Sequence, residues 1–202
     1  MANTSKVTGL RPVYPVIRAN VYKHVTGEPI YMYQPATLNG GGYAEIAVTD
    51  GTTAGEQLLG SVCGLLLGDW SPETSAYSGY LPANPTDVDS NGYVNVLIAD
   101  SPEQLFVIEE GTNSTALTQA AVGLGTVITM KTAASGSTIS GISQAILDER
   151  ANTAPSSNLN IQLIKLWDKP DNAFGDYAKW VVRINDHQYN PANGVAVTTP
   201  LV

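Results

Sequence analysis

One segment of the sequence has the residue types and spacing of a calcium-binding loop. Asp87-Val-Asp89-Ser-Asn91-Gly92 matches the first six positions of an EF-hand loop, in which side-chain oxygens hold the ion. An EF-hand also needs a bidentate Glu at its twelfth position, where this chain has Ile98. Asp, Asn and Gly are equally typical of a turn that leads into a strand, and we favour the turn. Asp87, Asp89 and Asn91 stay a candidate non-EF calcium site; we expect no other metal site and no cofactor.

His24 and His187 are the natural candidates for a general base. Nucleophilic catalysis needs a nucleophile, a base and an orienting group together, and no Gly-x-Ser-x-Gly or His-Glu-x-x-His motif occurs in the chain. Glu109 and Glu110 are neighbours on a predicted strand, so their side chains should point to opposite faces and not form an acid–base pair. We therefore predict that the protein is not an enzyme, and that His187 has a structural role.

The composition excludes several classes of partner. The chain has 202 residues, 10 Lys and Arg against 18 Asp and Glu, and a formal net charge of −8. Scattered basic residues on an acidic chain do not suit nucleic acid or an anionic membrane. No apolar run approaches the roughly 20 residues of a membrane span, and the N-terminus lacks the apolar core of a signal peptide. Cys63 is the only cysteine and lies in an apolar run, which predicts a buried, inert thiol in a protein made in a reducing compartment.

Frequent Gly, Pro, Thr, Ser and Asn, with only 14% charged residues, predict an all-β fold. We expect a mainly antiparallel β-sandwich or barrel, with a jelly roll among the alternatives and at most one or two short helices. The clearest signal is a long hairpin, in which residues 161–167 and 177–184 flank turn residues between Lys169 and Asp176. Residues 114–122 are the best helix candidate, with Ser114 as its cap. Further strands are predicted at residues 21–25, 30–33, 43–48, 58–67, 93–99, 105–109, 126–131 and 142–147.

Residues 1–20 are predicted to form an extended arm, and residues 21–202 a single β-rich domain. Pro12 and Pro15 would interrupt a central strand, so the arm is either an edge strand on its own domain or a segment that reaches a neighbouring subunit. Aromatic residues of a long loop could bind a sugar or anchor an interface. The candidate interface residues are Leu10, Arg11, Val13, Tyr14, Val16, Ile17, Trp70, Tyr77 and Tyr80.

Five features in the same order along the chain carry a resemblance to a known group. They are Met1-Ala-Asn3 with Gly9-Leu-Arg-Pro-Val13, then Tyr80-Leu-Pro-Ala83, residues 99–108, Lys169-Pro-Asp-Asn172 and Val182-Arg-Ile-Asn-Asp-His-Gln188. Together they resemble tailed-bacteriophage virion structural proteins of the capsid-decoration, or cement, type. Residues 111–157 match that group only in their general composition. The group has no single active site whose residues could be assigned to positions of this sequence.

The resemblance implies a virion protein that binds the outside of the capsid and stabilises contacts between neighbouring major-capsid subunits. It would be made in the bacterial cytoplasm and assemble with itself as a dimer or trimer, without nucleic acid or membrane as a partner. A neck or tail protein and a glycan- or receptor-binding β-domain are the alternatives. The acidic charge favours the outer surface of the shell, since the inner surface meets packaged DNA. The arm is expected to supply part of the contact.

Overall fold

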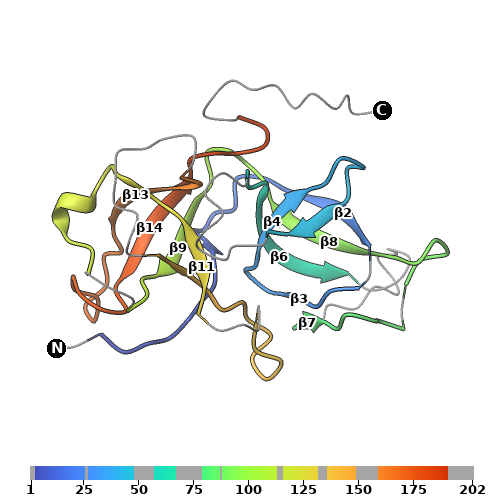
Figure 1. Cartoon of the computed structure of the whole chain (residues 1–202), viewed down its shortest axis with the longest axis horizontal. Coiled ribbons are helices and arrows are strands. Elements are labelled where there is room, and N and C mark those ends of the chain that lie inside the picture. Colours follow the sequence, from blue (N-terminus) through green and yellow to red (C-terminus); the bar gives the residue numbers. More distant parts are fainter. Residues whose placement is uncertain are drawn as a thin grey trace.

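The computed structural model confirms the predicted all-β class (Figure 1). Among the described residues the sheets are mainly antiparallel, and the helical structure is a single 3-10 turn, η1 (Gln119–Ala121). That part of the chain holds no helix with the length and apolarity to cross a membrane. The structure describes residues 3–25, 27–47, 57–66, 79–86, 88–112, 116–131, 136–148 and 159–190.

One lobe is built on a five-stranded antiparallel sheet in the order β1-β9-β14-β13-β10 (Figure 1). A two-stranded sheet, β11-β12, belongs to the same lobe, because the side chains of both strands enter its buried cluster. The strands are β1 (Arg11–Pro12), β9 (Leu105–Glu109), β10 (Gly125–Thr126), β11 (Ile128–Met130), β12 (Ala145–Leu147), β13 (Ile161–Leu166) and β14 (Lys179–Ile184).

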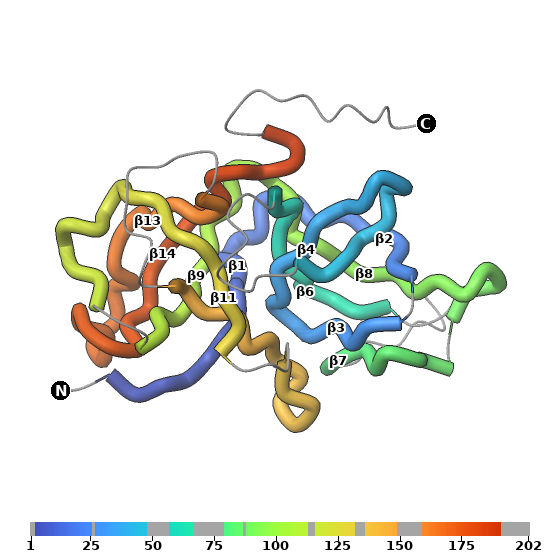
Figure 2. The backbone as a smooth tube through the Cα atoms, viewed as in Figure 1, coloured from blue at the N-terminus to red at the C-terminus, as the bar shows by residue number. Residues whose placement is uncertain are grey.

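The other lobe is a closed barrel in the order β2-β5-β4-β6-β8. Strands β2 and β8 pair antiparallel along their whole length, whereas β2 meets β5 in parallel only at His24 and Ala44. The short pair β3-β7 lies beside the barrel (Figure 2). The strands are β2 (Ala19–Val25), β3 (Ile30–Tyr31), β4 (Pro35–Leu38), β5 (Ala44–Ile46), β6 (Gly60–Leu66), β7 (Tyr80–Leu81) and β8 (Tyr93–Ala99).

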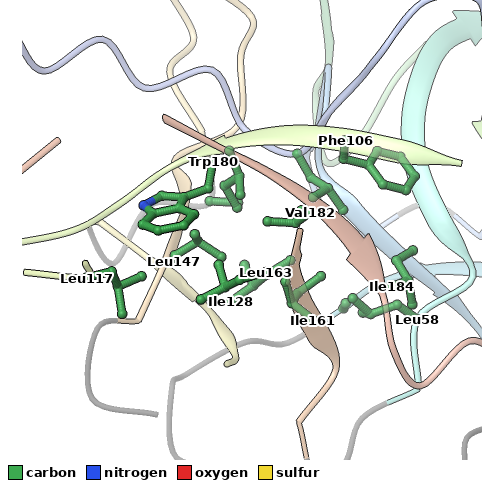
Figure 3. Close-up of a cluster of buried hydrophobic side chains, with 14 of the residues drawn as sticks. Leu58, Phe106, Leu117, Ile128, Leu147, Ile161, Leu163, Trp180, Val182 and Ile184 are labelled. Carbon is green, nitrogen blue, oxygen red and sulfur yellow. The ribbon is translucent and has the colours of Figure 1, made fainter. Parts of the chain in front are cut away.

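Each lobe has its own cluster of buried apolar side chains. In the first lobe Trp180 is the largest fully buried side chain, and its indole packs beside Leu147 and above Leu117 (Figure 3). The alternation of apolar residues on β9 and β14 puts Phe106, Ile108, Trp180 and Val182 on the same inner face. The barrel cluster is formed mainly by β6 and β8. Each lobe therefore has a core of its own.

Several segments join the lobes. Leu58 and Ala99 of the barrel side are buried in the cluster of the first lobe. Leu10 is fully buried there as well, and its carbonyl accepts a hydrogen bond from Ser61 Oγ at 2.5 Å. After β14 the chain crosses to the barrel, where the side chain of Gln188 bonds both the N–H and the carbonyl of Leu38 at 2.8 and 3.0 Å.

The predicted hairpin is present as β13 and β14, which pair antiparallel. Its turn is closed by Asn172, whose amide bonds the carbonyls of Trp167 and Lys179 and the N–H of Lys179, each at 2.8 Å. The predicted helix at residues 114–122 is wrong over its described part, residues 116–122, where only the turn η1 forms and Thr118 caps it. Ser114, the predicted cap, lies outside the described residues. Glu110 binds the N–H of buried Leu117 at 2.6 Å, which fixes the chain in a non-helical path just before that turn.

Candidate functional site

A short loop after β1 presents two large apolar side chains to solvent. We call residues 13–17 the arm loop. Tyr14 is 75% exposed and Ile17 is 59% exposed, although both follow a segment packed against the body. Between them Val16 is turned inward against the core of the first lobe. Exposed aromatic and aliphatic groups on an ordered support are typical of a protein-binding site.

The arm loop is held at both ends by Gln104, whose side chain is buried. The Gln104 Oε1 atom accepts the N–H of Ile17 at 2.8 Å, and Nε2 donates to the carbonyl of Val13 at 2.8 Å. The N–H of Val13 in turn donates to the carbonyl of Leu105 at 2.8 Å. Because the backbone at each end of the loop is hydrogen-bonded to Gln104 or Leu105, at the start of β9, the loop backbone has little freedom left to lose on binding.

The structure separates the predicted interface residues into two groups. Leu10 is fully buried, and Arg11 lies in edge strand β1 with its guanidinium 5.7 Å from the Trp167 ring centroid. Arg11 and Pro12 form an edge strand on the chain's own sheet, which is one of the two alternatives for the arm, and the arm loop follows that strand. Trp70 and Tyr77 lie outside the described residues. Tyr80 is half-buried and stacks on Tyr31 with ring centroids 5.6 Å apart, so this pair already covers one face of the ring.

The outer face of β2 and β8 adds apolar surface that the sequence analysis did not assign to a site. Val21 and Val25 are 44% and 47% exposed. Alternate side chains of a strand share a face, so Lys23 lies between them, and Val21 is directly opposite half-buried Leu97 on β8. We call this surface the β2–β8 outer face. The signal was present in the sequence as alternating valines, but only the barrel shows which alternation faces solvent.

Asp100, at the end of β8, fixes the start of β2 through a dense set of hydrogen bonds. Its buried carboxylate accepts from Arg18 Nε at 2.8 Å, from Asn20 Nδ2 at 2.7 Å and from the hydroxyl of Tyr22. Burial alone would raise the pKa of Asp100, but these three hydrogen bonds outweigh it and hold the pKa below its ordinary value. Burial also raises the pKa of Tyr22 strongly, with the bond to Asp100 adding to it. The cluster therefore has the features of a structural anchor, since a general base needs a free lone pair and a pKa near the working pH.

The histidines are also held by the fold. Burial lowers the pKa of His187 to about 4, and its Nδ1 accepts the N–H of Tyr189 at 3.0 Å. His24 Nδ1 lies 2.8 Å from the carbonyl of Ala44, where β2 meets β5. Among the described residues, neither imidazole has a hydrogen bond to a carboxylate or a hydroxyl nucleophile, which is the geometry that a Ser–His type mechanism needs.

The candidate calcium residues are engaged in a turn. Asp89 Oδ1 accepts the N–H groups of Asn91 and Tyr93 at 2.8 Å each, and Oδ2 accepts from Lys23 at 3.0 Å. The bond from the Tyr93 N–H is the largest of several that lower the pKa of Asp89. Asp87 lies outside the described residues. Within the described ranges, no three His, Cys, Asp or Glu side chains gather closely enough to hold a metal ion.

Glu109 and Glu110 contact different partners, as their adjacent positions on an extended strand predict. Glu109 accepts from Ser5 Oγ at 2.9 Å and lies 4.0 Å from Lys131 Nζ. Glu110 accepts from the indole of Trp180 at 2.7 Å. Both line a pocket of about 220 Å³ that also contains Lys131 and Tyr177. Each carboxylate already has protein donors, so neither has the environment of a free general base.

No protein-family model, curated protein or solved structure matches this chain. Its function therefore has to be inferred from its own residues. The arm loop and the β2–β8 outer face expose apolar side chains to solvent. The carboxylates and histidines described above are instead buried, and they form hydrogen bonds within the protein. That arrangement suits binding to another macromolecule better than chemistry on a small one.

Proposed function

We propose that this protein is a non-enzymatic structural protein of a tailed-phage virion, which binds the outside of the capsid and stabilises contacts between neighbouring major-capsid subunits. Support comes from the ordered segment resemblances, which run from residues 1–13 to residues 182–188. The structural observation that carries the proposal is the arm loop, where buried Gln104 holds exposed Tyr14 and Ile17 in position.

The physical demands of such a role match this arrangement. A cement protein carries out no reaction, but it must keep its shape under load and bind many equivalent sites. Binding costs less conformational entropy when the contact residues are already ordered, as the two hydrogen-bonded ends of the arm loop provide. Tyr in particular contributes a large, rigid contact area, and it is enriched among residues that dominate binding energy. Several modest contacts per assembly would add through their high effective concentration.

The overall charge supports an external position. A chain with a formal net charge of −8 is repelled by packaged DNA, which lies against the inner surface of the shell. The outer surface imposes no such penalty. The major capsid protein is therefore the proposed partner, and no nucleic acid takes part.

Copy number in purified particles is the direct test of location. A protein attached throughout the shell should be present at on the order of hundreds of copies, in fixed ratio to the major capsid protein, because the shell repeats its subunits by symmetry. About a dozen copies would instead place the protein in the neck or tail. Absence from the particle would overturn the proposal.

The role of the arm loop is tested by a double variant, Tyr14→Ala with Ile17→Ala. We expect it to fold with the thermal stability of the wild type, since both side chains project into solvent, and to lose at least about tenfold in affinity for shells that lack the protein. Ile139→Ala is the matched control, because Ile139 is 98% exposed on a turn far along the chain and should bind as the wild type does. Equal binding by the double variant and the control would remove the arm loop from the contact.

A further inference from the structure

Basic residues that are scattered in the sequence come together on one face of the five-stranded sheet, where β9, β14 and β13 lie side by side (Figure 1). Directly opposed residues of an antiparallel pair project their side chains from the same face. Arg11 is opposite Val107 on β9, and Val107 is opposite Val181 on β14. Val181 is in turn opposite Lys165 on β13. These four residues form one row across the sheet, on the side away from the apolar core.

Two further cations flank this row on β14. Lys179 and Arg183 each lie two positions from Val181 on the extended strand, so their side chains project from the same face. The hydrogen bond from Arg183 Nε to Gln162 Oε1, at 2.7 Å, joins the side chains of two neighbouring strands on that side. We call this surface the cationic sheet face, and its basic residues are Arg11, Lys165, Lys179 and Arg183.

The charges of the cationic sheet face are not neutralised within the described part of the chain. The ion pairs of that part are formed by Arg18, Lys23 and Lys131, none of which belongs to the face. The carboxylate that the strand register places on this side is Glu109, which is fully buried and accepts the backbone N–H of Lys6 at 2.6 Å. The face therefore presents positive charge on a protein whose formal net charge is −8.

Trp167 holds two cations beside the same face. Its N–H donates to the carbonyl of Lys179 at 2.8 Å, which places it next to β14 where the hairpin turn begins. The Arg11 guanidinium lies 5.7 Å from its ring centroid, and the Lys169 ammonium lies 5.1 Å from it. An aromatic ring attracts a cation but leaves its charge in place. Within the described residues the buried Nε of Arg11 also has no hydrogen-bond partner, so a carboxylate would find unused donors here.

We propose that the cationic sheet face binds a carboxylate-rich segment of another protein. The inference goes beyond the proposed function and does not depend on it, because there the arm loop carries the contact with the capsid. Guanidinium and ammonium groups bind carboxylates through charge-assisted hydrogen bonds. The row from Arg11 to Lys165 crosses β1, β9, β14 and β13, a span of about 14 Å that about four or five residues of an extended segment would cover.

A nucleic acid fits this face less well. The exposed carboxylates of Asp168, Asp171 and Asp176 border the face at the hairpin turn, and exposed Glu103 lies just before β9 at its other end. A phosphate backbone that continued past the face would meet these like charges. Trp167 is also unsuited to stacking on a base, because two cations already lie against its ring. A short acidic segment encounters neither obstacle.

Titration with a synthetic peptide of about eight Glu residues tests the proposal. At about 50 mM salt we expect saturable binding by calorimetry, at least about tenfold weaker at 300 mM, because salt screens exposed charges. Shifts of backbone amide NMR signals should be confined to β9, β13 and β14. Lys165→Gln should weaken binding about threefold, and its combination with Arg183→Gln about tenfold. Lys23→Gln is the matched control, since it also removes one exposed positive charge, but from the barrel, and it should leave the affinity unchanged.

Several results would overturn the inference. One is no binding of the peptide at about 50 mM salt, and another is an equal effect of Lys165→Gln and Lys23→Gln, which would mean that only net charge attracts the peptide. Tighter binding of a single-stranded oligothymidylate of equal charge would make nucleic acid the partner. A dimer detected by light scattering and dissociated by Lys165→Gln would show that a second copy occupies the face. None of these measurements uses phage shells, so their failure and the failure of the proposed function are distinguishable.

Discussion

Gln104 bonds the backbone of Ile17 across 87 positions of sequence, with its Oε1 accepting the Ile17 N–H at 2.8 Å. The amide nitrogen of the same side chain donates to the carbonyls of Val13 and Leu105 at 2.8 Å each. One buried amide thus satisfies three backbone groups at the base of the arm loop. The same amide therefore both ties the arm loop to the sheet and supports the backbone that carries Tyr14.

We predict that Gln104→Leu, which is similar in size, releases the arm loop. It leaves the Ile17 N–H and the Val13 carbonyl without their partner, which should lower the free energy of unfolding by about 2 kcal/mol. Hydrogen exchange at the Ile17 amide should accelerate, and shell affinity should fall although Tyr14 and Ile17 are intact. Gln162→Leu is the control, since the Gln162 amide also has two partners but is only half-buried. Exchange at Ile17 as slow as in the wild type would contradict the role given to Gln104.

Where local pattern and burial agree, the sequence was enough to predict structure. Strands β8 and β9 have the predicted bounds because their apolar residues form the inner faces of the two lobes. The hairpin was predictable because Asn172 and its neighbours carry their own turn chemistry. Strand β4 was missed, since Pro35 suggests a break, yet it is tolerated at the first position of a strand.

The candidate site was predictable only in part. Tyr14 and Ile17 could be named from the sequence as apolar residues close to Pro12 and Pro15, but Leu10 has the same character and is fully buried. Which of them projects depends on Gln104 and Tyr33, contacts that no local pattern encodes. The outward orientation of Val21, Lys23 and Val25 on β2 likewise needed the barrel.

The barrel should be sensitive to a single added methyl group at Gly60. A Cβ atom there would lie 2.0 Å from the carbonyl oxygen of Ala99, so β6 and β8 would have to separate. We predict that Gly60→Ala lowers the free energy of unfolding by about 3 kcal/mol or more. Gly40→Ala, with no atom within 4 Å of the added Cβ, should change it by less than about 0.5 kcal/mol. Urea unfolding of the two variants provides the comparison, and similar midpoints would refute the close approach of the strands.

The Asp100 anchor should determine part of the acid stability. Because the folded pKa of Asp100 lies below its ordinary value of 3.8, the stability that it contributes is present above that value and is lost as the pH falls through the folded pKa. Tyr22→Phe removes one of the bonds that hold the pKa down, so the folded pKa should rise and acid unfolding should begin at a higher pH. Tyr43→Phe removes a hydroxyl whose hydrogen bond, within the described part of the chain, is to Tyr93 at 3.3 Å, and it should leave the acid midpoint unchanged. Acid titrations of the wild type and both variants, followed by tryptophan fluorescence, provide the measurement. A shift in Tyr22→Phe alone is expected, and coincident curves for all three proteins would contradict the prediction.

His187 should make the protein less stable as the pH falls from neutral. The unfolded chain takes up a proton at this side chain near its ordinary pKa of 6.5, whereas burial keeps the folded group neutral until about pH 4. Between these values the unfolded state binds more protons, so the free energy of unfolding falls with decreasing pH, by roughly 3 kcal/mol over the whole interval, and the loss levels off below it. His187→Asn keeps an acceptor for the Tyr189 N–H but cannot titrate, so its stability should be flatter between pH 6.5 and 4. Urea unfolding of the wild type and of His187→Asn is measured across this pH range. Subtracting one free energy of unfolding from the other removes the contribution of the carboxylates, which both proteins share. A difference that does not change with pH would show that His187 titrates normally in the folded state.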